Sequence, residues 1–118
     1  MRKIKNPYAG LEGYNCFGCS PKNPCGLKME FFEDGDEIVC TWNPQDYFCG
    51  YGTILHGGIQ STLMDEIACW VVFTRLRTAG FTSSLTVRFL RQVLTDQGPL
   101  SLRAVILEKE KNIANISV

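Results

Sequence analysis

The stretch that decides the fold is ILHGGIQSTLMDEIACW, residues 54–70. A histidine and two glycines lead into an apolar run, and two adjacent carboxylates, Asp65 and Glu66, lie inside that run. From Gly57 to about Arg77 no proline interrupts the chain, and apolar residues recur at helical spacing. The stretch therefore predicts a long helix that carries two charged side chains in an apolar setting.

The apolar side chains of IACWVVF, residues 67–73, extend around most of the circumference of this helix. A helix that is apolar all round is buried, so we expect a curled sheet to enclose it. Arg75 and Arg77 lie near its end, where positive charge suits the helix dipole. Gly80 is the expected stop.

Segments with strand composition lie on both sides of the helix. Residues 27–32 and 37–42 flank Glu-Asp-Gly-Asp, a turn signal, and together predict a β-hairpin. Residues 1–26 are rich in Gly, Pro, Asn and Cys and predict an ordered loop or arm. Three strands are expected after the helix, in SSLTVRFLRQV (83–93), GPLSLRAVILEKEK (98–111) and NIANISV (112–118).

One domain accounts for a chain of 118 residues with an apolar content of 45%. A single long helix between groups of antiparallel strands places that domain, residues 1–118, in the α+β class. The last predicted strand is still running at Val118, and we expect the strand that would complete the sheet to be absent from this sequence.

Charge and hydropathy argue against two classes of partner. Twelve basic and twelve acidic side chains cancel, so the net charge would draw the protein neither to nucleic acid nor to an anionic membrane. The longest apolar run, residues 67–73, is far too short to span a bilayer. No apolar stretch follows the basic N-terminus as it would in an export signal. We therefore expect a cytoplasmic protein.

The sequence contains six cysteines, and Cys16, Cys19 and Cys25 lie in NCFGCSPKNPCGL. In the cytoplasm these thiols are expected to be reduced. The Cys-x-x-Cys spacing could begin a zinc site, but a structural zinc site needs four ligands, and Cys49 or His56 would have to complete it. We expect structural thiols, no metal and no cofactor of the protein's own.

Asp65 is the leading candidate for chemistry. Glu66 shares its surroundings with the bulky Leu63 and Trp70 and is expected to be structural. A carboxylate beside open space suits a general base or a nucleophile, whereas the alternative is a carboxylate that only hydrogen-bonds to its own fold. The neighbours of Asp65 on the helix surface, three and four positions away, are all small: Ser61, Thr62, Ala68 and Cys69.

Gly57 and Gly58 would begin the helix with unpaired N–H groups that a substrate carbonyl can approach closely, which suits a developing oxyanion. The simpler alternative is that two glycines let the chain turn. At about 1.5 Å rise per residue, Gly57 and Asp65 lie roughly 12 Å apart. If both act on one bond, they come from different subunits of a homodimer. His56, the only histidine, could act as a base, but we favour a role in bracing the helix start.

The segment HGGIQSTLMDE, residues 56–66, followed by SSLTVRFLRQV, resembles the hotdog-fold thioesterases, specifically their PaaI-like (phenylacetic-acid-pathway) branch. In that family His-Gly-Gly opens the central helix, and the catalytic carboxylate falls at Asp65. The upstream NCFGCSPKNPCGL is similar to a Cys-Phe-Gly-Cys and Asn-Pro-x-Gly-Leu segment in a subset of these proteins. The usual Arg-Pro after the strand is Arg91-Gln92 here.

The resemblance implies a long helix held in a curved antiparallel sheet, assembly as a homodimer and often as a dimer of dimers, and hydrolysis of acyl-CoA thioesters. It implies that Gly57 and Gly58 polarise the thioester carbonyl, and that Asp65 attacks this carbonyl or activates a water. A hydroxyl early in the next strand would assist, and the candidates are Thr82, Ser83 and Ser84. The candidates for contacts with the phosphates of coenzyme A are Arg88, Arg91 and Arg103.

Two other functions stay open. An acyl-CoA hydratase or dehydratase would need a histidine paired with the carboxylate, and His56 lies too far along the helix unless a partner chain supplies it. A non-catalytic acyl-CoA-binding module would use Asp65 only as a hydrogen-bond acceptor. We expect a short-chain, medium-chain or aryl acyl group. Several aromatic residues could line a tunnel for this group or could equally belong to the core: Trp70, Phe73, Phe81 and those of loop 47–51.

Overall fold

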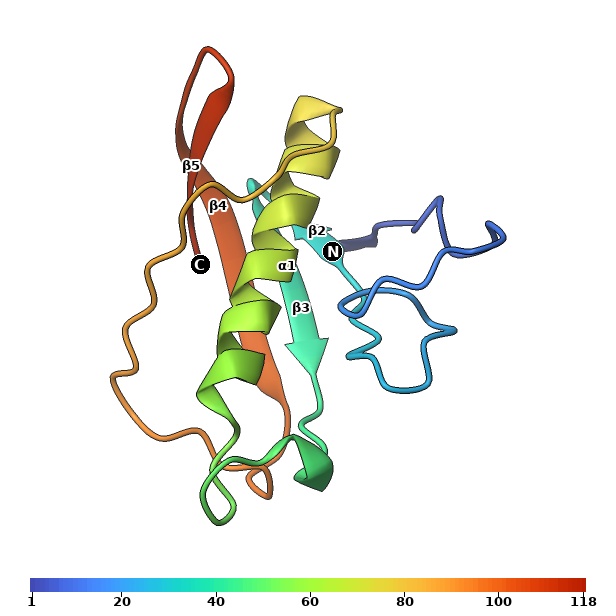
Figure 1. Ribbon diagram of the computed structural model, residues 1–118. Helices are drawn as coiled ribbons and strands as arrows, with labels where there is room; N and C mark the ends of the chain where they lie inside the picture. Colours follow the sequence, from blue (N-terminus) through green and yellow to red (C-terminus); the bar gives the residue numbers. More distant parts are fainter.

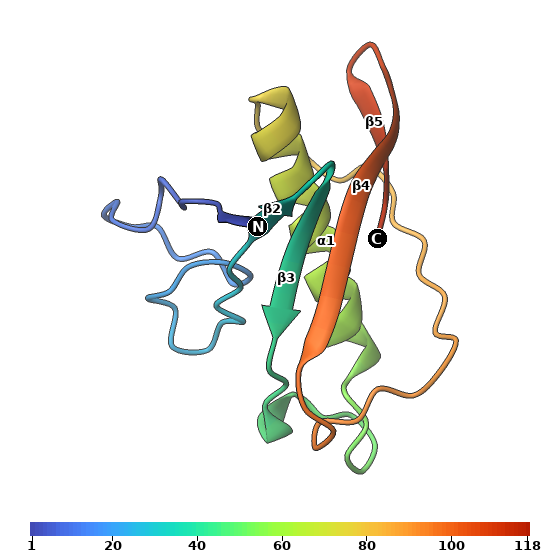
Figure 2. The same cartoon turned by 180° about the vertical axis from the view of Figure 1, so that it is seen from behind.

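The computed structural model describes all of residues 1–118 and shows one long helix, α1 (Gly57–Leu76), lying across one face of an antiparallel sheet (Figure 1). Figure 2 shows the other face of the sheet, with the helix behind it. This arrangement confirms the expected α+β class and the hotdog packing of helix and sheet. No helix of the chain has the length and apolar character needed to cross a membrane. The strands follow their chain order across the sheet: β1 (Arg2–Lys3), β2 (Phe32–Asp34), β3 (Glu37–Trp42), β4 (Leu100–Glu110) and β5 (Ile113–Ser117).

The hydrophobic core lies between α1 and the sheet. Trp70 is buried in it and stacks on Phe31 with ring centroids 5.0 Å apart. Trp42 at the end of β3 donates a 2.8 Å hydrogen bond from its indole N–H to the carbonyl of Leu27, which satisfies its polar atom in a buried setting. The most deeply buried side chains from the helix and the two central strands are Leu63, Ile67, Val71, Ile38, Cys40 and Ala104.

The helix begins at Gly57 as predicted but ends at Leu76, before the predicted stop at Gly80. Arg77 follows in the left-handed conformation, with a φ of 56°, so a residue other than glycine terminates the helix. The sheet covers one side of α1, and helix residues outside its buried stripe, among them Met64 and Val72, are only half buried. Enclosure of the helix within this single chain is therefore less complete than predicted.

The predicted hairpin forms, but its first strand is shorter than expected. Strand β2 covers only Phe32–Asp34, and β3 covers Glu37–Trp42 as predicted. Gly35 occupies the turn with a φ of 64°, a conformation that favours glycine. Residues 27–31 leave the sheet because their backbone binds the N-terminal arm: the Leu27 N–H donates to the Phe17 carbonyl at 2.8 Å, for example. The arm itself supplies the short strand β1, which the sequence did not predict.

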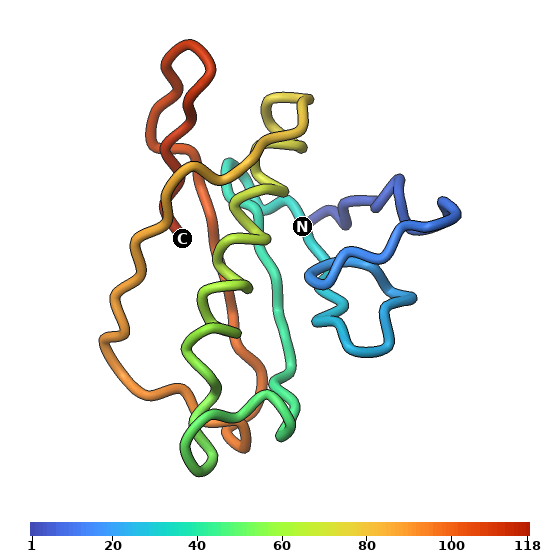
Figure 3. The backbone as a smooth tube through the Cα atoms, viewed as in Figure 1, coloured from blue at the N-terminus to red at the C-terminus, as the bar shows by residue number.

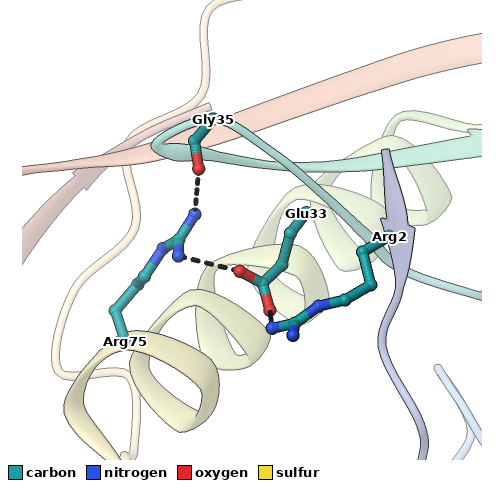
Figure 4. Close-up of polar contacts among 4 residues, drawn as sticks. All are labelled: Arg2, Glu33, Gly35 and Arg75. Atoms are coloured by element: carbon teal, nitrogen blue, oxygen red, sulfur yellow. Dashed lines mark hydrogen bonds and ion pairs between the residues drawn. The ribbon is translucent and has the colours of Figure 1, made fainter.

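A polar cluster joins the end of the helix to the hairpin (Figure 4). Arg75, in the last turn of α1, donates to Glu33 on β2 at 3.0 Å and to the carbonyl of Gly35 at 2.7 Å. Arg2 on β1 binds the other oxygen of Glu33 at 2.5 Å. The hydrogen bond from Arg2, helped by the charges of Arg2 and Arg75, lowers the pKa of Glu33 below its ordinary value.

Residues 83–93 do not form the predicted strand. After α1 the chain returns in an extended course beside the helix, on the side away from the N-terminal arm (Figure 3). A strand needs hydrogen-bonding partners along its length. Residues 83–93 meet another segment only at their end, where the Val93 carbonyl accepts a 2.7 Å hydrogen bond from the Leu55 N–H. The next residue, Leu94, forms an isolated bridge with Ile54. Two strands, β4 and β5, follow the helix instead of three, and β5 is left at the edge of the sheet.

Candidate functional site

A cavity of about 930 Å³ opens beside Asp65, between α1, the returning segment 78–87 and the β4–β5 hairpin. This volume lies within the range of roughly 300–1,000 Å³ that is typical of small-molecule sites. Of the small neighbours expected around Asp65, Ala68 and Cys69 line the cavity. The hydroxyls of Ser61 and Thr62 instead donate to helix carbonyls one turn back, at 2.9 and 2.8 Å.

The carboxylate of Asp65 is half buried at the wall of this cavity. The Thr82 hydroxyl donates to Asp65 Oδ1 at 2.5 Å, and Cys69 Sγ lies 3.9 Å from the same hydroxyl. Ser83 and Ser84 also line the cavity but make no hydrogen bond to Asp65. Asp65 Oδ2 has no hydrogen-bond partner within the chain, so one carboxylate oxygen is held in place and the other is available to a ligand or a water.

Of the two glycine amides expected to be free at the start of α1, only that of Gly57 is free. His56 is the N-cap residue, and its Nδ1 accepts a 2.9 Å hydrogen bond from the Gly58 N–H. The prediction of an unpaired amide is therefore wrong for Gly58, because the neighbouring imidazole satisfies it. The Gly57 N–H makes no hydrogen bond within the chain. The Phe89 ring packs against Gly57, where an added Cβ would lie 3.4 Å from the ring.

The three arginines expected to meet phosphates lie outside the cavity lining. Arg103 is held by Asp34 at 3.0 Å and Glu37 at 2.9 Å, and these hydrogen bonds raise the pKa of its guanidinium further. Arg88 and Arg91 are exposed on the returning segment and form no ion pair.

The cationic side chains that do line the cavity are Lys109, near the end of β4, and Lys111, in the turn between β4 and β5. Sequence reasoning missed them. Their position over the helix depends on the order of strands in the sheet, which the sequence does not reveal.

The aromatic residues proposed as tunnel or core fall into three groups, and Phe48 joins the core group by packing against Trp42 with centroids 5.8 Å apart. Trp70 and Phe73 stack on each other with centroids 5.2 Å apart and belong to the core region. Phe81 lines the cavity and is 98% exposed in the single chain. Tyr47 and Tyr51 are exposed on the loop before α1 and do not line this cavity.

The six cysteines are all free thiols. Cys49 and His56, the residues that a four-ligand zinc site would have needed, are absent from the group formed with Cys16 and Cys19. His56 caps the helix, and Cys49 pairs with Leu55 in an isolated bridge. Burial, followed by a hydrogen bond with Glu66, raises the pKa of the Cys19 thiol. Glu66, which was expected to be structural, is the acidic group beside these two thiols.

Residues 52–118, more than half of the chain, match a family model described as Thioesterase superfamily. The matched region contains the helix start, Asp65, Thr82 and the β4–β5 hairpin, and it excludes the cysteine-bearing arm. No curated protein and no solved structure matches the chain.

Proposed function

The chain belongs to the thioesterase superfamily, and from that membership we propose that it is an acyl-CoA thioesterase of the PaaI-like branch. It hydrolyses a short-chain, medium-chain or aryl acyl-CoA to the free acid and coenzyme A. Six free thiols suit a reducing compartment such as the cytoplasm, where we place this activity.

The observation that carries the proposal is the position of Asp65 on the cavity wall, with one oxygen bound by Thr82 and the other free. In one form of the reaction, Asp65 takes a proton from a water whose oxygen attacks the thioester carbon. In the other form, the Asp65 oxygen attacks that carbon itself and forms an anhydride with the acyl group, which a water later hydrolyses to release the acid and restore Asp65. In both forms the C–S bond breaks as the tetrahedral oxyanion collapses, and coenzyme A leaves as a thiolate that then takes up a proton.

The oxyanion needs a donor, and the free Gly57 N–H at the positive end of the helix dipole is the best available. Within one chain it lies roughly 12 Å from Asp65, by the rise of the helix. We therefore propose that the donor comes from a second subunit, with two helices antiparallel across a twofold axis. Gly58 contributes only if its hydrogen bond to His56 is released.

The returning segment supports pairing of two copies. Phe81 is 98% exposed and Leu90 81% exposed, and Leu85 and Phe89 are also exposed. Clustered apolar side chains of this kind on a monomer surface mark an interaction site. The contact of Phe89 with Gly57 places this apolar segment next to the proposed oxyanion donor. We propose a homodimer, which can pair further into a dimer of dimers.

Coenzyme A carries phosphates, and Lys109 and Lys111 supply positive charge at the edge of the cavity. The acyl group would meet the apolar part of the wall. Its side chains, from the helix, the returning segment and β5, include Met64, Ala68, Val72, Leu76, Phe81 and Ile116.

The experiment that tests this proposal measures free thiol release from a panel of acyl-CoAs, for the wild type and for Asp65→Asn. The same two proteins are titrated with a non-hydrolysable acyl-CoA analogue by calorimetry. We expect turnover by the wild type, loss of turnover in Asp65→Asn, and retained binding in both. Binding without turnover by either protein would show a non-catalytic acyl-CoA-binding module, and hydration of an enoyl-CoA without thiol release would show a hydratase.

A further inference from the structure

The N-terminal arm and the helix bring two thiols and a carboxylate to one point. Cys16 and Cys19 come from the arm, and Glu66 comes from the middle of α1. The Cys16 thiol donates to Glu66 Oε1 at 3.3 Å, and the two sulfur atoms and a carboxylate oxygen all lie within 4.8 Å of one another. These residues lie outside the region that matches the thioesterase family, apart from Glu66 itself.

The arm is shaped to approach this carboxylate. Gly18, between the two cysteines, is buried against Glu66, and an added Cβ would lie 2.5 Å from Glu66 Cδ. Only glycine permits this approach. Backbone hydrogen bonds hold the loop in place, from Ser20 to Cys16 at 3.0 Å and from Met29 to Gly18 at 2.9 Å. The two thiols are therefore presented by a pre-ordered loop.

The cluster lacks positive charge. Glu66 is half buried and forms no ion pair, and the hydrogen-bond donors that reach its carboxylate are cysteine thiols, which are weak donors. A half-buried carboxylate ordinarily has a cation or strong donors as partners. By contrast, Glu33, Asp34 and Glu37 on the β2–β3 hairpin each form an ion pair with an arginine.

We propose that Cys16, Cys19 and Glu66 bind one Zn²⁺ ion, with water at the fourth position. Thiolate ligands select zinc over magnesium or calcium. With Zn–S distances of about 2.3 Å and Zn–O distances of about 2.1 Å, ligands around a tetrahedral ion lie roughly 3.4–3.8 Å apart. The three ligand atoms lie within 4.8 Å of one another, so the ion would draw them about 1 Å closer together. Cys19 Sγ, which now lies 2.7 Å from the Tyr14 hydroxyl, would turn toward the ion.

The ion would connect the arm to α1 through Glu66, the residue that follows Asp65. It would thereby stabilise the helix that carries the proposed catalytic carboxylate. Cys25 belongs to the same cysteine-rich segment but is exposed and lies outside the cluster. This difference supplies a matched control within the chain.

The test uses the full chain, reduced and stripped of metal with a chelator, and does not depend on enzyme activity. Zn²⁺ is titrated by competition with a chromophoric chelator, and bound zinc is counted by mass spectrometry. We expect one Zn²⁺ per chain for the wild type and for Cys25→Ser. In Cys16→Ser, Cys19→Ser and Glu66→Gln we expect the affinity to fall at least about tenfold.

Co²⁺ provides a second measurement on the wild type, in case a cysteine variant fails to fold. Thiolate ligation gives an intense near-ultraviolet charge-transfer band, and tetrahedral geometry gives strong visible bands. A wild-type protein that binds no stoichiometric Zn²⁺, or whose Co²⁺ complex lacks the charge-transfer band, overturns the proposal. Unchanged affinity in Glu66→Gln overturns the assignment of the carboxylate.

Discussion

The hydroxyl of Thr82 donates to the carboxylate of Asp65 at 2.5 Å, and so joins the returning segment to the middle of α1. We treat Thr82 as a positioning residue that holds the carboxylate at the cavity wall. Hydrogen bonds to charged groups contribute about 1.5–3 kcal/mol, so Thr82→Val should lower kcat by roughly 10- to 100-fold. Thr82→Ser keeps the hydroxyl and should retain most of the activity. Steady-state thiol release measures both variants.

If Thr82 only positions Asp65, its replacement should lower kcat and leave KM nearly unchanged. The value of KM should change little in Thr82→Val, because Thr82 acts on Asp65 and not on the bound substrate. Valine keeps the volume of threonine and removes only the hydroxyl, so wild-type activity in Thr82→Val would show that the hydroxyl has no such role.

The free amide at the start of α1 can be removed without removing the helix. Gly57 is the first helical residue, where proline is well tolerated because its missing N–H would be unpaired there. Gly57→Pro should lower kcat by about 10²- to 10³-fold, as expected for loss of an oxyanion donor. Gly57→Ala keeps the N–H, and its methyl would meet the Phe89 ring at an ordinary 3.4 Å. It should stay near wild-type activity, and equal kcat in the two variants would contradict the assignment.

Lys109 and Lys111 should bind the phosphates of coenzyme A by charge. Replacing both with methionine should raise KM severalfold with little change in kcat, and should weaken the dependence of KM on salt, since exposed charges are screened. Lys22→Met removes an exposed charge on the N-terminal arm and is the control. A KM that stays constant in the double variant would assign phosphate binding elsewhere, with Arg88 and Arg91 as the next candidates.

The cluster around Glu33 should make stability depend on pH. Its folded-state pKa lies below its ordinary value of 4.5, chiefly through the hydrogen bond from Arg2. The stability from this carboxylate is therefore present above its unfolded pKa and is lost as the pH falls through the lowered folded value. Urea unfolding should show the wild type more stable than Glu33→Gln at neutral pH, with a difference that shrinks in acid. Glu12→Gln, which removes an exposed carboxylate without an ion pair, should show no such trend.

Local patterns in the sequence predicted most of the helix and strands, including strands whose partners lie far away along the chain. The helix from Gly57 and the strands β3, β4 and β5 formed as predicted, because each carries its own periodicity. Residues 83–93 carry the alternation of a strand, but apart from one backbone hydrogen bond at Val93 no neighbouring strand pairs with them in this chain. The prediction of a strand from periodicity alone was therefore wrong. Residues 27–31 likewise bind the arm instead of the hairpin.

In the candidate site too, some features could be predicted from the local sequence and others depended on how distant segments pack. Helical spacing placed Asp65 among small neighbours, and the structure puts a cavity there. The position of His56 before the first helical residue agrees with the predicted bracing role, since its side chain accepts the hydrogen bond that the Gly58 N–H donates. The positions of Lys109, Lys111 and Glu66 could not be predicted, because they depend on which segments pack against the helix.

The central claim is that Asp65 of one subunit works with the Gly57 amide of the other. A heterodimer of one Asp65→Asn chain and one Gly57→Pro chain, isolated with two affinity tags, tests this claim most directly by its rate of thiol release. One of its two sites would combine an intact Asp65 with an intact Gly57 from the opposite chain, so we predict about half of the wild-type activity per dimer. A heterodimer as inactive as the two parent homodimers would contradict the account.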